Sequence, residues 1–184
     1  MTTPENQAVS LLRAQYQNAH EVLEGTMQDV TAEQAHWSPP GIANPLGATY
    51  AHILVSEDGV INGMLKGSAP LCVTTWANKM GVSELPPMPG PEVEGLPPWD
   101  EWARRVKVDQ VALGSYAQAV YAATDEYLAS LTDEDLNRTL DLSGMGVGQQ
   151  TLGWLLSLML ANVNWHTGEI SCLKGLQGAR GYPF

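Results

Sequence analysis

Three polar residues near the carboxyl end of this 184-residue chain have the types and the spacing of a ligand set. Asn162, His166 and Glu169 lie in the segment ANVNWHTGEI, and steps of three and four residues place them on one face of a helix. Neutral imidazole binds zinc, nickel, copper or ferrous iron, and an amide or carboxylate oxygen can complete such a set. A lone interior histidine is, however, more often a hydrogen-bonded core residue. The segment therefore leaves two interpretations open: a metal site, or core residues whose polar groups are hydrogen-bonded within the protein.

Four long helices are predicted around these residues from apolar spacing and cap signals. The first opens at Thr3-Pro4-Glu5 and carries its apolar stripe to Met27. A short capped turn follows at 31–34, and three glycines within 136–150 predict a loop or small hairpin. The other three long helices are predicted at 46–65, after the cap-plus-proline signal of Asn44 and Pro45, at 99–131, and at 151–176, before Gly178.

A proline-rich connection separates the second and third predicted helices. It runs from Gly67 to Pro98, and six of the chain's 12 prolines lie between Pro86 and Pro98. A link of about thirty residues is unusual inside a compact domain. A link of this length is needed if the two helices run parallel, because the chain must then travel the length of the bundle between them. We therefore predict an all-α, up-down-down-up four-helix bundle that forms a single domain over residues 1–184.

The helix directions place three histidines at similar heights. With a rise of 1.5 Å per residue, His20 lies roughly 24 Å above the base, His52 roughly 29 Å and His166 roughly 23 Å. Three helices therefore contribute a histidine to one layer of the bundle. His36 follows in a connecting turn beside Trp37, where we expect it to be exposed.

Composition excludes some classes of function. The net charge of −11 disfavours nucleic acid and anionic membrane surfaces as partners. The most apolar run, from Leu152 to Leu160, is far shorter than the ~20 residues of a membrane span. The two cysteines, a hundred residues apart, form no disulfide framework, and the first residues do not resemble a signal peptide. We expect a cytoplasmic protein.

Several short motifs together resemble the DinB-like superfamily. Residues 44–52 (NPLGATYAH) resemble the opening of the family's second helix, and Thr151-Leu-Gly-Trp154 followed by Asn162-x-x-x-His166-Thr-Gly-Glu169-Ile170 resembles its fourth. Gly175-x-x-Gly178 and the final Gly-Tyr-Pro-Phe184 are similar to family endings. The resemblance spans nearly the whole chain and implies a bundle with the same up-down-down-up topology.

The resemblance also implies a divalent metal, zinc or nickel, held by three histidines. His52 matches the ligand of the second helix and His166 the second ligand of the fourth, whereas the remaining histidine of the pattern is replaced by Asn162. An amide oxygen is a weaker ligand for these metals than imidazole. We therefore consider His20 as an additional ligand from the first helix, and Glu169 as a ligand or as a residue that orients His166.

The resemblance implies metal-dependent transfer, isomerisation or hydrolysis that uses a low-molecular-weight thiol such as bacillithiol or mycothiol, with a small electrophile. Two alternatives stay open beside this activity. Asn162 favours a non-catalytic bundle that has lost full metal binding and acts as a ligand-binding or interaction protein. Trp37, Trp76 and Trp99 in predicted loops or ends could instead serve a partner-binding module. Family members pair through bundle faces, so a homodimer is expected.

Overall fold

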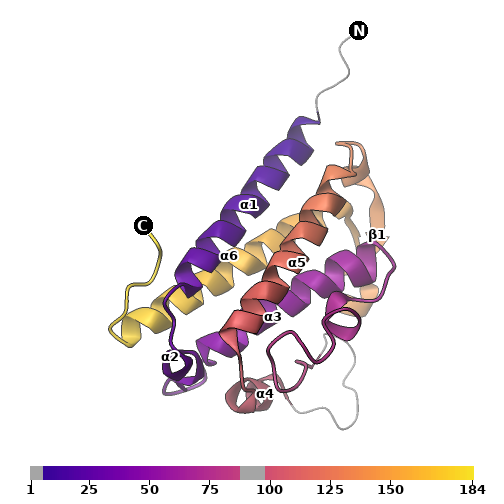
Figure 1. Ribbon diagram of the computed structural model, residues 1–184. Helices are drawn as coiled ribbons and strands as arrows, with labels where there is room; N and C mark the ends of the chain where they lie inside the picture. Colours follow the sequence, from indigo (N-terminus) through magenta and orange to yellow (C-terminus); the bar gives the residue numbers. More distant parts are fainter. Residues whose placement is uncertain (1–5, 88–97) are drawn as a thin grey trace.

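The computed structural model describes residues 6–87 and 98–184, and these fold as a helical bundle with one small hairpin (Figure 1). Six α-helices lie in the described residues: α1 (Gln7–Met27), α2 (Ala32–His36), α3 (Leu46–Asp58), α4 (Trp99–Arg105), α5 (Gln110–Ala129) and α6 (Leu152–Leu176). A π-helix, η1 (Gly59–Leu65), continues α3, and 3-10 turns occur at Leu71–Val73, Asp135–Asn137 and Ser143–Met145. The predicted helical bundle is confirmed. The predicted helix opening at Thr3 lies outside the described residues.

The four long helices pack around a shared core. Helices α1 and α3 each contact both α5 and α6, so that the four axes surround apolar side chains that all of them contribute. Tyr16, Tyr50, Tyr116 and Trp102 are among the largest fully buried side chains. In the described residues no helix is both long enough and apolar enough to cross a membrane.

Hydrogen bonds between helices fix the direction of each one. Tyr16 of α1 donates to the carbonyl of Leu156, and Lys174, at the far end of α6, donates to the carbonyl of Thr26, so α1 and α6 run parallel. Both α3 and α5 run the opposite way to α1. The pairs that show this are His20 with Glu57 and Glu24 with Tyr50 for α3, and Arg13 with Asp125 and Glu24 with Tyr121 for α5.

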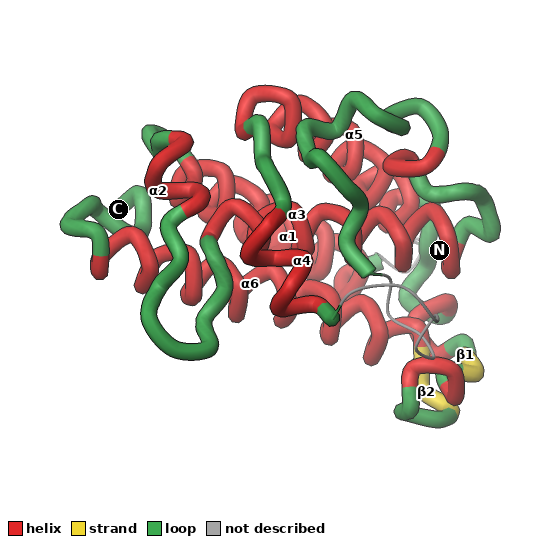
Figure 2. Tube along the Cα trace, turned by 90° about the horizontal axis from the view of Figure 1, so that it is seen from below, coloured by secondary structure: helices red, strands yellow, loops and turns green. Residues whose placement is uncertain are grey.

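A two-stranded antiparallel hairpin precedes α6. Strand β1 (Thr139–Asp141) pairs with β2 (Gln149–Thr151) in a register that sets Leu140 opposite Gln150. The predicted hairpin within 136–150 is therefore present, and it lies at one end of α6 in Figure 2, with the C-terminus at the other. Thr151 caps α6, since its side-chain oxygen accepts the N–H of Trp154.

The single helix predicted over 99–131 is wrong, because the chain breaks between Arg105 and Gln110. Val108 forms an isolated antiparallel bridge with Val82, and its N–H donates to a ring nitrogen of His36. Asp109 then caps α5 by accepting the N–H groups of Val111 and Ala112. The apolar spacing continues through this break, which is why the pattern alone predicted one helix. Most of the proline-rich part of the connection, residues 88–97, lies outside the described residues.

Candidate functional site

His52 of α3 and His166 of α6 lie side by side. Their ring centroids are 5.0 Å apart and the ring planes are nearly perpendicular, at 88°. The two residues come from helices whose axes run in opposite directions, 114 positions apart in the chain, so only the bundle brings them together. The structure therefore places these two predicted site residues in contact.

His52 lies in a poorly hydrated position beside an indole ring. Its ring centroid is 4.6 Å from that of Trp99, which comes from α4. Burial, together with the neighbouring His166, lowers the pKa of His52 to about 4. His52 is consequently neutral near pH 7. The hydroxyl of Ser56 lies 3.4 Å from Nδ1 of His52, at the long end of the hydrogen-bond range.

His166 is oriented by a carboxylate on its own helix. Its Nδ1 lies 2.5 Å from Oε2 of Glu169, one turn further along α6. A carboxylate oxygen only accepts, so Nδ1 of His166 is the donor in this contact. Glu169 therefore occupies the position that orients a histidine, and it is largely exposed.

An apolar cavity of about 320 Å³ opens next to His52, between α3, η1 and α6. We call it the α3–α6 cavity. Its polar lining consists of His52, Ser56 and Asn162, and its remaining lining is apolar: Val55, Gly59, Val60, Met64, Pro86, Pro87, Met145, Leu158, Met159 and Trp165. The side-chain nitrogen Nδ2 of Asn162 is buried and has no hydrogen-bond partner among the described residues. A buried amide donor without a partner costs about 1–3 kcal/mol, so a ligand acceptor there would recover that cost.

The π-helix η1 shapes one wall of this cavity. It begins at Gly59, and Gly59, Val60 and Met64 all line the α3–α6 cavity. Buried Asp58, directly before it, accepts the backbone N–H groups of Leu71 and Cys72 and so holds the start of the crossover. Single π-helical turns occur frequently at functional sites.

A second cavity, of about 680 Å³, lies on the other side of His52. We call it the Trp99 cavity, because Trp99 lines it together with His52, His166 and Glu169; its other lining residues are Ile42, Ala43, Asn44, Thr49, Cys172, Leu173 and Leu176. Asn44 was predicted to cap the second long helix, which is wrong. Pro45 occupies the cap position, no side chain caps that helix, and Oδ1 of Asn44 is buried without a partner. Sequence reasoning missed Asn44 as a lining residue, although its place in the NPLG motif was a usable signal.

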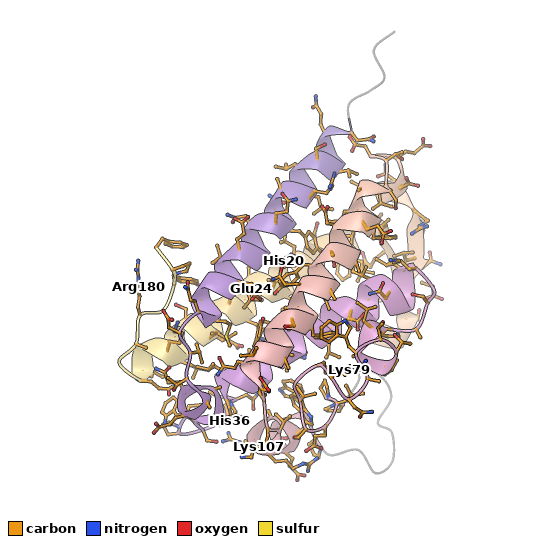
Figure 3. The ribbon with its side chains drawn as sticks, viewed as in Figure 1. His20, Glu24, His36, Lys79, Lys107 and Arg180 are labelled. Carbon is orange, nitrogen blue, oxygen red and sulfur yellow. The ribbon has the colours of Figure 1, made fainter. Side chains whose placement is uncertain are left out.

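His20 does not join this group. Its Nε2 lies 3.0 Å from Oε2 of fully buried Glu57, and its ring stacks on Tyr121 with centroids 3.8 Å apart. It lines a different cavity, with Arg13 and Asp125, between α1 and α5. Figure 3 shows His20 and Glu24 between these two helices.

His36 and the predicted loop tryptophans have structural roles. The expectation that His36 is exposed is wrong: it is half-buried, its Nε2 accepts the N–H of Val108, and its Nδ1 donates to the carbonyl of Ala32. Trp37, Trp76 and Trp99 are partly buried and pack against the core. They therefore do not form the exposed aromatic surface that a partner-binding module would use.

The residues present do not complete a three-ligand metal centre. The described residues contain no group of three His, Cys, Asp or Glu side chains arranged to hold a metal ion. Two imidazoles meet here, and Nδ2 of nearby Asn162 has no partner among the described residues. An amide offers a weaker, neutral oxygen in place of imidazole.

Comparison with known proteins identifies the family. The model of the DinB superfamily matches residues 15–170, so the chain belongs to the DinB superfamily. Among solved structures it is similar to a conserved protein from Enterococcus faecalis, with a TM-score of 0.68 and 23% sequence identity over 90% of this chain and 94% of that chain. That likeness shows the fold alone. No curated protein matches the sequence.

Proposed function

We propose that this DinB-superfamily protein binds a small, mainly apolar molecule in the α3–α6 cavity. One observation carries the proposal: an apolar cavity of about 320 Å³ is lined by Asn162, whose buried amide nitrogen has no partner among the described residues. Ligand sites typically combine apolar walls with a few fixed polar groups. Neutral His52 and the unpartnered amide supply those groups here.

A fluorescent probe tests this proposal directly. N-phenyl-1-naphthylamine is uncharged, aromatic and brighter in apolar surroundings, so titrating it into the full-length protein reports occupancy of an apolar cavity. We expect saturable binding that is lost in Leu158→Trp, because Leu158 lines the cavity and the indole would fill it.

Leu11→Trp is the matched control for that substitution. Leu11 is exposed on α1 and lines none of the cavities described above, so this variant should bind the probe as wild type does. Equal binding by Leu158→Trp, or no saturable binding by wild type, would contradict the proposal.

A divalent ion held by His52 and His166 is the second candidate. Zn–N bonds are about 2.0–2.1 Å, so two imidazoles that share a tetrahedral zinc have centroids roughly 5 Å apart. The observed separation of 5.0 Å supports this candidate. With two imidazoles and an amide the affinity should be low, and a metal-dependent thiol transferase or hydrolase would depend on this ion.

Metal analysis separates the two candidates. Protein purified without a histidine tag should contain less than one equivalent of zinc or nickel. Asn162→His should bind zinc at least about tenfold more tightly, equivalent to 1.4 kcal/mol, because it adds a third imidazole. Asn164→His, on the exposed side of the same helix, is the control and should change nothing. If the wild-type protein contains one equivalent of tightly bound metal, the ion and not the apolar molecule is its principal ligand.

A further inference from the structure

The walls around His52 contain no cationic side chain. Among the described residues that line the α3–α6 cavity and the Trp99 cavity there is no Lys or Arg, and Glu169 is their one carboxylate. An anion that entered would find no ion-pair partner, and the net charge of −11 opposes its approach.

The α3–α6 cavity is equally unsuited to a cation. The described residues that line it include no carboxylate, and Glu169 lies in the other cavity. An ion of either sign would therefore lose its hydration without gaining a countercharge, a cost of several kcal/mol. Asn162 lines this cavity, and its Nδ2 is a buried donor that has no partner among the described residues and requires an acceptor atom.

We infer, on the basis of the proposed function, that the molecule bound in the α3–α6 cavity is uncharged and carries a carbonyl-type oxygen that accepts a hydrogen bond from Nδ2 of Asn162. The apolar remainder of the molecule contacts the cavity walls around Val60, Leu158 and Met159. Carboxylates, phosphates and protonated amines are excluded from this cavity as ligands.

Three six-carbon molecules that differ only in their polar end test the inference. Hexanamide, hexanoate and hexylamine are respectively neutral, anionic and cationic at pH 7, and each is titrated against bound N-phenyl-1-naphthylamine. We expect hexanamide to displace the probe at roughly millimolar concentration, as its few heavy atoms allow. Both ions should require at least about tenfold more.

A substitution of the donor connects this selectivity to Asn162. In Asn162→Leu the affinity for hexanamide should fall several-fold, because the carbonyl loses its hydrogen bond. The control Asn164→Leu changes an exposed asparagine of the same helix and should keep the wild-type affinity for hexanamide. The dissociation constant of N-phenyl-1-naphthylamine is measured first for each variant, so that the hexanamide affinities can be calculated from displacement and compared.

The outcomes separate this inference from the proposed function. Probe binding together with equal displacement by hexanoate or hexylamine would overturn the uncharged ligand and leave the cavity as a binding site. Unchanged hexanamide affinity in Asn162→Leu would overturn the role of the amide. Absence of probe binding to wild type would instead overturn the proposed function itself.

Discussion

The region around His20 and the region around His52 differ in whether their buried polar groups have hydrogen-bond partners. Around His20 the polar groups are paired: Glu57 accepts from Thr124 and contacts His20, while Tyr50 and Tyr121 both donate to Glu24. Around His52, two buried amide atoms, Nδ2 of Asn162 and Oδ1 of Asn44, have no partner in the described part of the chain. A paired network stabilises the fold, whereas unpaired buried groups cost stability and are retained where a ligand can satisfy them.

The comparison shows why height along a bundle does not identify a site. All three histidines were predicted in one layer, but the rise per residue gives position along the axis and not the direction of a side chain. His20 faces Glu57 and Tyr121, whereas His52 faces His166 and Trp99. The fully buried carboxylate of Glu57 therefore belongs to the paired region.

The largest expected effect is the loss of a partner in the paired region. His20→Ala leaves the fully buried carboxylate of Glu57 without its imidazole, which should lower the free energy of unfolding by about 3–5 kcal/mol in urea denaturation. The double variant His20→Ala/Glu57→Gln removes the charge as well and should recover part of that loss. If the free energy of unfolding of His20→Ala falls by less than about 1 kcal/mol, the difference between the two regions is contradicted.

A pair of asparagine substitutions should give smaller effects of opposite sign. Asn162→Leu removes an unpartnered buried amide and should raise the free energy of unfolding by about 1 kcal/mol. Asn62→Leu is the matched change in a paired position, because Nδ2 of Asn62 donates to Asp58 at 2.8 Å, and it should lower the same quantity by about 1–3 kcal/mol. Destabilisation of both variants to the same extent would remove the distinction between the regions.

The smallest effect is expected for the exposed carboxylate near His166. Glu169→Ala should change the free energy of unfolding by less than about 0.5 kcal/mol, since an exposed pair on one helix contributes little. Thermal unfolding at two salt concentrations measures this change. A decrease of more than about 1 kcal/mol in the free energy of unfolding would show that Glu169 stabilises the fold, as Glu57 does.

Sequence patterns predicted the long helices but not their interruptions. Apolar residues located α1, α3 with η1, and α6: α1 and α6 each bury one stripe, whereas α3 is buried on nearly all sides. The break before α5 depends on contacts of Val108 with Val82 and His36, which come from distant segments. Asp109 was the local signal for that break, since it caps α5.

The candidate site was predictable as far as local motifs reach. The NPLG…H and N-x-x-x-H motifs located His52, Asn162 and His166, and the family resemblance paired His52 with His166, whereas height along the bundle also included His20. The cavities and the unpartnered state of Asn44 and Asn162 were not predictable, because they depend on how distant segments such as η1, Pro86, Pro87 and α6 pack. Residue spacing predicts which side chains share a helix face, but it does not predict the cavities that remain between packed helices.

A crystal structure of the protein soaked with hexanamide tests the central claim most directly. The account predicts hexanamide density in the α3–α6 cavity, with the carbonyl oxygen within hydrogen-bond distance of Nδ2 of Asn162. Density only in the cavity beside His20, or none in the α3–α6 cavity at saturating hexanamide, would contradict it.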